Sequence, residues 1–138
     1  MIVVDTNIIG YLYLTSDRSG QAEKALMKDD EWAAPVLWRS ELRNVLALYL
    51  RKNMLSLSDA IQIMDDATML MRGREYETVS MDVLQLVSES KCSAYDCEFV
   101  ALARDLNVRL VTVDKQILRE FPGDAIPLEE YVDSNRSG

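Results

Sequence analysis

The sequence predicts an α/β protein in which helices alternate with the strands of a mostly parallel central sheet. Two short apolar runs rich in β-branched residues, 2–4 and 110–113, have the length and composition of strands buried on both faces. Between them lie longer segments whose apolar residues recur every three or four positions, as on one face of a helix. Because strand, helix and strand in succession form a parallel βαβ unit, this alternation indicates helices packed around a parallel sheet.

The other elements follow from the same two patterns. Residues 36–52 place Trp38, Leu42 and Val45 on a single helical stripe. Residues 58–71 overlap a Ser-x-Ser-Asp sequence typical of a helix N-cap. Weaker patterns predict further strands at 31–34, 76–79 and 125–126, and further helices at 8–14, 21–28, 81–89 and 95–106.

Length and composition indicate one domain. The chain has 138 residues, 49% of them hydrophobic, which is enough to build one buried core. We expect this domain to span residues 1–133 and to be followed by a polar, disordered tail at 134–138. No apolar run approaches the ~20 residues that cross a bilayer, and the first residues lack the basic segment of a secretory signal. We therefore expect a soluble, cytoplasmic protein with no membrane attachment.

The chain contains no histidine, and this absence excludes several classes of site. Ser-His-Asp hydrolysis, Cys-His catalysis and His-ligated zinc all require an imidazole. Cys92 and Cys97 lack the spacing of a zinc or Cys-x-x-Cys redox motif, so we interpret them as reduced thiols. The 23 acidic and 15 basic residues give a formal charge of −8, which opposes non-specific binding to nucleic acid. Any chemistry must use carboxylates, hydroxyls, amines or bound ions.

Two aspartates directly follow predicted strands. Asp5 ends the first strand, and Asp114 ends the strand at 110–113. Ligands of open parallel sheets bind outside the carboxyl ends of the strands, so both side chains are candidates for a site. Each also precedes a helical segment, and helix capping explains either of them taken alone.

Glu41 is an acid at a position where an apolar residue is expected. It lies on the helical stripe between Trp38 and Val45, and this stripe should face the core. A carboxylate there is costly unless a cation or several donors meet it. The alternative to a functional role is a structural ion pair with Arg39 or Arg43.

Asp96 belongs to the first turn of the helix predicted at 95–106. Ser93 can cap this helix while Asp96 reaches back, a variant of the capping box with Asp in place of Glu or Gln. Asp96 also shares a helix face with Phe99 and Val100, which directs it toward the sheet. Glu98 is turned about 200° from Asp96 on a helix with 3.6 residues per turn, so we interpret it as a solvated or peripheral acid.

These four acids suggest a site for a hard divalent cation. Carboxylates gathered in one place repel and raise one another's pKa unless a cation neutralises them. Without histidine or a thiolate cluster, ligation by oxygen alone favours Mg²⁺ or Mn²⁺. Such a site suits phosphoryl chemistry, because the ion neutralises the phosphate, lowers the pKa of a bound water and stabilises the leaving oxygen.

Four motifs together resemble the PIN domain, and most of all the VapC-type toxins of bacterial and archaeal toxin–antitoxin pairs. The resemblance covers residues 2 to about 128 and rests on the order and spacing of the motifs, since each alone is short. It implies a three-layer α/β/α, PIN-like fold and a ribonuclease that depends on Mg²⁺ or Mn²⁺. The motifs are Val3-Val4-Asp5-Thr6-Asn7, Ser40-Glu41-Leu42-Arg43-Asn44-Val45, the segment 95–103 and Leu110-Val111-Thr112-Val113-Asp114.

The resemblance also implies roles for particular residues and partners. Asp5, Glu41, Asp96 and Asp114 would form the catalytic and metal-binding set, with Asn7 and Thr112 in support. A metal-activated water would cleave RNA and leave a 5′-phosphate and a 3′-hydroxyl. Family members commonly form homodimers and are inhibited by an antitoxin protein. From their proximity in sequence to the acids, we add three candidate phosphate contacts: Arg43, Lys115 and Arg119.

Three alternatives remain open at this stage. A receiver-type signalling domain also has an acidic Mg²⁺ pocket, but it needs a phospho-acceptor Asp at the end of a central strand and a Lys at the end of a late one. A haloacid-dehalogenase-like phosphatase needs Asp-x-Asp after its first strand, where this chain has Asp5-Thr6-Asn7. A non-catalytic PIN-like binding module, with structural acids, is the third.

Overall fold

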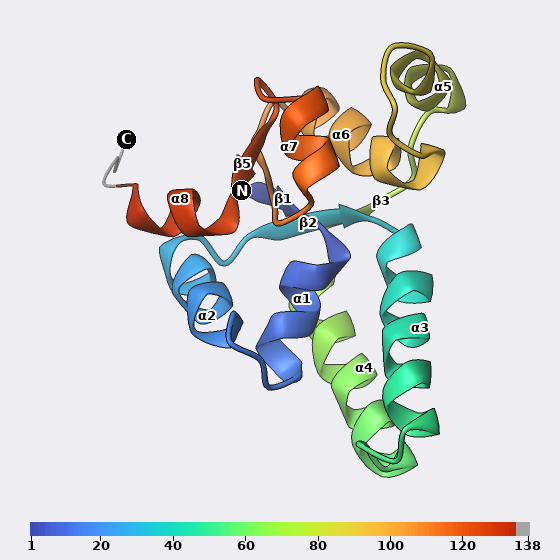
Figure 1. The fold of residues 1–138 in the computed structure, drawn as a ribbon, viewed down its shortest axis with the longest axis vertical. Helices are drawn as coiled ribbons and strands as arrows, with labels where there is room; N and C mark the ends of the chain where they lie inside the picture. The colour runs from blue at the N-terminus through green and yellow to red at the C-terminus, as the bar shows by residue number, and fades with distance from the viewer. Residues whose placement is uncertain (135–138) are drawn as a thin grey trace.

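A five-stranded, entirely parallel sheet forms the centre of the computed structural model, which describes residues 1–134 (Figure 1). The strand order is β3-β2-β1-β4-β5, so the first strand is central. Receiver domains have the order 2-1-3-4-5, and this difference excludes the receiver alternative. The strands are β1 (Ile2–Val4), β2 (Trp32–Pro35), β3 (Glu75–Tyr76), β4 (Leu110–Thr112) and β5 (Ala125–Pro127).

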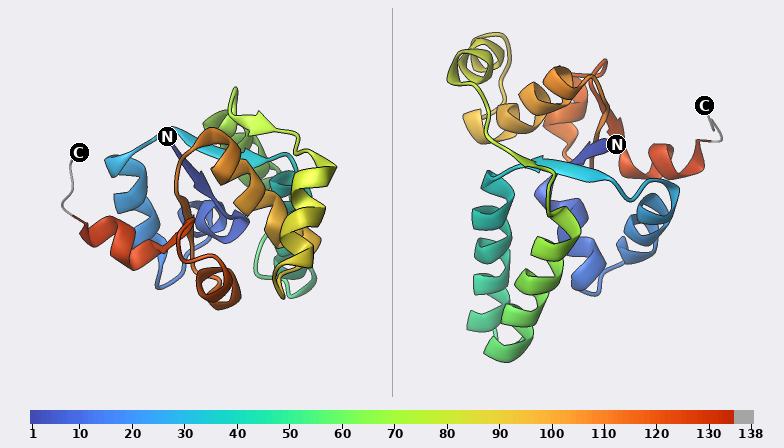
Figure 2. Two further views of the ribbon diagram at one scale, coloured as in Figure 1. Left: turned by 90° about the horizontal axis from the view of Figure 1, so that it is seen from above. Right: turned by 180° about the vertical axis from the view of Figure 1, so that it is seen from behind.

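Helices cover both faces of the sheet, which confirms the three-layer α/β/α prediction (Figures 1 and 2). The chain moves from β1 outward to β3 and then returns past β1 to β4 and β5. Because parallel crossovers are right-handed, these two directions place their helices on opposite faces. One face carries α1 (Thr6–Tyr13), α2 (Ser19–Lys28), α3 (Leu37–Arg51) and α4 (Leu57–Met71); the other carries α5 (Ser80–Ser88), α6 (Ala94–Leu106) and α7 (Lys115–Glu120). The last helix, α8 (Leu128–Asp133), packs against α2.

The sequence prediction was wrong in two places. The strand expected at 76–79 is only Glu75–Tyr76, because its partner β2 ends at Pro35 and leaves no further ladder. Val79 instead precedes α5 and is 60% exposed. Helix α8 was not predicted, since its six residues are too few to show a helical period. Of the predicted tail 134–138, only Ser134 is described, as the residue that ends α8; the other four lie outside the described residues.

The geometry of β1 and β4 creates the position for a site. These adjacent strands are fully buried at Val3, Val4 and Val111, and Val4 pairs with Val111. The connections that follow β1 and β4 leave toward opposite sides of the sheet, which makes their carboxyl ends a topological switch point. The next residues in register are Asp5 and Thr112. None of the described helices is both long and apolar enough to span a membrane.

Candidate functional site

Asp5 and Thr112 meet at the switch point because their strands are in register. The Thr112 hydroxyl donates a hydrogen bond to one oxygen of the Asp5 carboxylate. The other oxygen accepts a hydrogen bond from the backbone N–H of Ile8 at 3.3 Å, so Asp5 also caps α1. Asp5 is 7% exposed and Thr112 is fully buried. Asp5 can therefore cap α1 with one carboxylate oxygen and still belong to a site at the end of β1.

Asp114 shares this arrangement at the end of β4. Its carboxylate accepts hydrogen bonds from the backbone N–H groups of Gln116 at 2.9 Å and Ile117 at 3.0 Å, and it caps α7. Its own backbone N–H donates to the Thr112 hydroxyl at 3.0 Å. Thr112 thus bonds to both aspartates and fixes their relative position.

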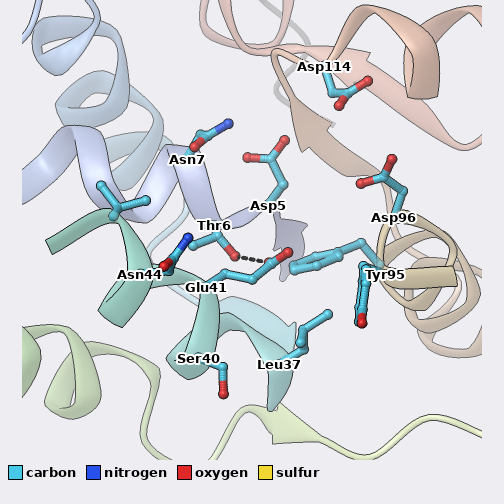
Figure 3. Close-up of a pocket in the computed structure, with 12 residues that line it drawn as sticks. Asp5, Thr6, Asn7, Leu37, Ser40, Glu41, Asn44, Tyr95, Asp96 and Asp114 are labelled. Atoms are coloured by element: carbon cyan, nitrogen blue, oxygen red, sulfur yellow. Dashed lines mark hydrogen bonds between the residues drawn. The ribbon is translucent and has the colours of Figure 1, made fainter. Parts of the chain in front are cut away.

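Asp96 approaches from the opposite face, at the start of α6. The Ser93 hydroxyl accepts a hydrogen bond from the Asp96 backbone N–H at 3.1 Å, as the predicted cap requires. This cap fixes the first turn of α6 and directs the side chain toward the sheet edge. In Figure 3 the carboxyl groups of Asp5, Asp96 and Asp114 face a common space.

Glu41 completes the set from α3, but in a different way. The Thr6 hydroxyl donates a hydrogen bond of 2.6 Å to the Glu41 carboxylate, which therefore points at α1 (Figure 3). The two arginines considered as ion-pair partners are engaged elsewhere: Arg39 binds Glu75, and Arg43 bonds to the Arg39 carbonyl oxygen and the Ser40 hydroxyl. The ion-pair interpretation of Glu41 was therefore wrong.

The four carboxylates line one cavity of about 500 Å³, which we call the acidic cavity. Among the residues that line it in the described part of the chain there is no lysine or arginine. Sequence reasoning did not assign a role to several lining residues, because neither a charge nor a strand end distinguishes them. They are Thr6, Leu37, Ser40, Asn44, Val45, Tyr95 and Phe99.

The pKa values of the acids reflect burial without a cation. Desolvation is the main cause that raises the pKa of Asp5 to about 6, against hydrogen bonds from Thr112 and Ile8 that lower it. Burial also raises the pKa of Asp96, and the charge of Asp114 adds to the effect. The pKa of Glu41 is raised by burial first, opposed by the Thr6 hydrogen bond. Raised carboxylate pKa values in a cavity are typical of functional sites.

The other predicted residues lie at different distances from this cavity. Asn7 lines it, with an exposed side chain for which no hydrogen bond is present in the described structure. The candidate phosphate contacts Arg43, Lys115 and Arg119 are exposed and do not line the cavity. Glu98 is half-buried and accepts a hydrogen bond of 3.3 Å from Thr78, so it is peripheral rather than fully solvated.

The donor set fits a hard divalent cation that keeps much of its water. Within residues 1–134 no three acidic or thiol side chains are arranged to enclose an ion together. Mg²⁺ in proteins is usually held by only one or two carboxylates and retains several waters. Three carboxylates that face one space, with no lysine or arginine among the described lining residues, meet that requirement. Burial raises the pKa of two of them, Asp5 and Asp96.

The fold and cavity define a class: a parallel α/β/α domain with a carboxylate-lined site at the switch point of its sheet. Within this class, residues 2–123 match the sequence profile of the PIN domain. The chain therefore belongs to the PIN domain family, and the resemblance inferred from the four motifs is confirmed.

Relatives of known name or structure agree with this assignment. Ribonuclease VapC3 of Pyrobaculum aerophilum is 29% identical over 129 residues, which cover 91% of this chain and 98% of the relative. The crystal structure of PAE2754 from Pyrobaculum aerophilum has a TM-score of 0.74 at 21% identity, covering 95% of this chain and 92% of that one. FitAcB from Neisseria gonorrhoeae has a TM-score of 0.69 at 20% identity, covering 92% and 96%. Both structures share the fold.

Proposed function

We propose that the protein is a divalent-metal-dependent endoribonuclease, the toxin of a VapBC-type toxin–antitoxin pair. The observation that carries the proposal is the acidic cavity, in which four carboxylates meet without a lysine or arginine among the lining residues. A phosphodiester is an anion and cannot enter such a cavity until cations neutralise it. Similarity to Ribonuclease VapC3 supports RNA as the substrate class.

Asp5, Asp96 and Asp114, with Glu41 beside them, are the residues that would hold Mg²⁺ or Mn²⁺. When bound, the ion neutralises the phosphate, lowers the pKa of water and stabilises the leaving oxygen. No protein nucleophile is required, which agrees with a chain that has no histidine and two buried cysteines. Burial raises the pKa of both Cys92, to about 11, and Cys97, so both thiols are protonated and unreactive at neutral pH.

The protein contributes by holding the acids in place before any ligand arrives. Thr112 fixes Asp5 against Asp114, and Thr6 holds Glu41. Glu41 lines the cavity while it accepts this hydrogen bond, so one of its oxygens would remain available to an ion. Hydrogen bonds of this kind orient the groups that bind a metal.

Partner proteins belong to the same proposal. Two of the similar structures are FitAcB and FitAB bound to a DNA fragment, the latter with a TM-score of 0.71 at 19% identity. Together with the VapC relative they support a cognate antitoxin for this chain. A homodimer is supported by exposed apolar side chains at α5, where Val79, Met81 and Leu84 are 60%, 75% and 61% exposed.

Cleavage of RNA by the purified protein tests the proposal. We expect cleavage with Mg²⁺ or Mn²⁺, none with EDTA, and a loss of at least about 100-fold in Asp96→Asn, because the bound ion supplies several kcal/mol of stabilisation. Asp65→Asn is the matched control, since Asp65 is an exposed acid on α4 that does not line the acidic cavity and should leave cleavage unchanged. Cleavage that persists in EDTA, or full activity in Asp96→Asn, would contradict the proposal.

A further inference from the structure

A second hollow continues the acidic cavity between α1 and α3. It has a volume of about 180 Å³, and we call it the α1–α3 groove. It shares Thr6, Asn7 and Val45 with the acidic cavity, so the two hollows adjoin. In Figure 3, Asn7 on α1 and Asn44 on α3 lie at the side of the cavity where the two helices approach each other.

Helical spacing explains why the groove leads away from the acids. Asn7 and Tyr11 are four residues apart and lie on one face of α1, and Leu14 follows as its C-cap. On α3, Val45 and Tyr49 continue the stripe that begins at Glu41. From Glu41 to Tyr49 the helix rises about 12 Å, at 1.5 Å per residue. The groove is therefore a short track that begins at the carboxylates and ends between two tyrosines.

The end of the groove farther from the carboxylates has two tyrosines and a nearby arginine, whereas no lysine or arginine of the described chain lines the acidic cavity. Tyr11 and Tyr49 are both half-buried, so part of each ring remains accessible. The Arg18 guanidinium lies 6.0 Å from the centre of the Tyr11 ring and donates a hydrogen bond of 3.5 Å to its hydroxyl. Within residues 1–134 Arg18 forms no salt bridge with an acid, whereas Arg39 and Arg104 do. Its charge is available to an anionic ligand.

We propose that the α1–α3 groove binds the nucleotide next to the scissile phosphate, with its base against Tyr11 and Tyr49 and its outer phosphate near Arg18. This inference rests on the proposed function and adds a base-binding subsite to it. Bases of single-stranded RNA are held by stacking on aromatic side chains and by hydrogen bonds to their edges. Asn7 offers a donor and an acceptor for such an edge, because its side chain is exposed and unbonded in the described structure.

The composition of the groove favours RNA over a protein helix. An amphipathic helix docks through several aliphatic or aromatic anchors into an apolar groove. Here the aliphatic side chains are Leu14 and Val45, and Leu14 is only 8% exposed. The remaining lining is made of Thr, Asn, Ser, Tyr and a glycine. Two partly exposed tyrosines, polar side chains and a nearby arginine that forms no salt bridge within residues 1–134 match a nucleotide better than an apolar peptide.

The test uses short single-stranded RNAs that carry 2-aminopurine at one position each, mixed with the wild-type protein and Mg²⁺ and followed by stopped flow before cleavage. The fluorescence of 2-aminopurine falls when its ring stacks on an aromatic side chain. We expect a decrease at one position beside the cleavage point, its loss in Tyr49→Ala and Tyr11→Ala, and its retention in Tyr49→Phe. Affinity should fall about tenfold in each alanine variant, since stacking on one aromatic ring accounts for that order of effect.

Tyr13→Ala is the matched control, because Tyr13 is also half-buried on α1 but its hydroxyl bonds to the Asp66 carbonyl oxygen on α4. It should leave both fluorescence and affinity unchanged. An unaltered signal in Tyr49→Ala and Tyr11→Ala, or a groove that a partner protein occupies without any effect on RNA binding, would overturn the inference. Failure of the proposed function is seen separately, as the absence of metal-dependent cleavage by the wild-type protein.

Discussion

Two half-buried glutamates near the start of α3 show opposite electrostatics. Glu75 on β3 receives two hydrogen bonds of 2.6 Å from the Arg39 guanidinium and one of 2.7 Å from the Trp38 indole N–H. These bonds lower the pKa of Glu75. Glu41 lies two residues after Arg39 on α3. It accepts one hydrogen bond, from the Thr6 hydroxyl, and burial raises its pKa.

The two glutamates differ in whether the protein itself supplies a cationic partner for the carboxylate. An arginine lies on α3 within one turn of Glu41, yet its side chain turns to the sheet edge and neutralises Glu75. The acidic cavity keeps its carboxylates without such a partner, at a cost in folding free energy. The Glu75 site is thus complete within the described chain, whereas the acidic cavity would, under the proposed function, take a cation from solution.

The largest expected effect is on the pH dependence of stability. Because the pKa of Asp5 is about 6 in the folded protein and 3.8 ordinarily, the folded state retains a proton that the unfolded state has lost between these values. The free energy of unfolding should therefore fall by about 2 kcal/mol as pH rises from 4 to 6 in metal-free buffer, out of about 3 kcal/mol over the whole transition. Glu75, with a lowered pKa, has the opposite slope below pH 4.5.

Urea unfolding at a series of pH values measures this slope. Subtracting the curve of Asp5→Asn from that of the wild type isolates the contribution of Asp5, and saturating Mg²⁺ should remove it. Equal slopes in the two proteins would mean that Asp5 ionises as easily as an exposed acid.

The next effect concerns the hydroxyl that joins the two aspartates. Thr112→Val should lower the free energy of unfolding by about 1–2 kcal/mol, because the backbone N–H of Asp114 and the Asp5 carboxylate both lose a buried partner. Cleavage should fall about 10- to 100-fold, as expected for a residue that orients metal-binding groups. Thr112→Ser keeps the hydroxyl and should retain most of both; if Thr112→Val behaves like the serine variant, Thr112 does not position the aspartates.

The smallest effect compares the two glutamates directly. In metal-free buffer Glu41→Gln should raise the melting temperature, because it removes a disfavoured charge and its amide oxygen can still accept from Thr6. Glu75→Gln should lower it, because Arg39 loses its partner. Partial exposure limits each change to at most ~1 kcal/mol, or a few degrees. Calorimetry of the two variants side by side checks the signs; a loss of stability in Glu41→Gln would show that its charge is compensated.

The parts of this protein that could be predicted depend on local sequence pattern. Asp5 and Asp114 became candidates because each directly follows a predicted apolar strand, 2–4 and 110–113, and Glu41 because it interrupts a helical stripe. The sequence could not predict that Arg39 pairs with Glu75 and not with Glu41. Glu75 is 36 residues away from Arg39 and lies next to α3 only when β3 pairs with β2. The hydrogen bond from Thr6 to Glu41 could not be predicted either, because these residues are 35 positions apart and meet only in the folded protein.

The same distinction applies to the groove and the chain ends. Tyr11 and Tyr49 have ordinary helical positions in sequence, and only the packing of α1 against α3 brings them together. Short elements such as β3 and α8 depend on their neighbours in the fold, because two strand residues and six helical residues are too few to show a period.

Binding of Mn²⁺ at neutral pH, followed by electron paramagnetic resonance of the free ion, tests the central claim most directly. The account predicts saturable binding that weakens at least ~10-fold in Asp5→Asn and is unchanged in Glu75→Gln, because Glu75 is already paired with Arg39 and the described lining of the acidic cavity contains no lysine or arginine. Absence of binding, or equal binding by Asp5→Asn and the wild type, would contradict it.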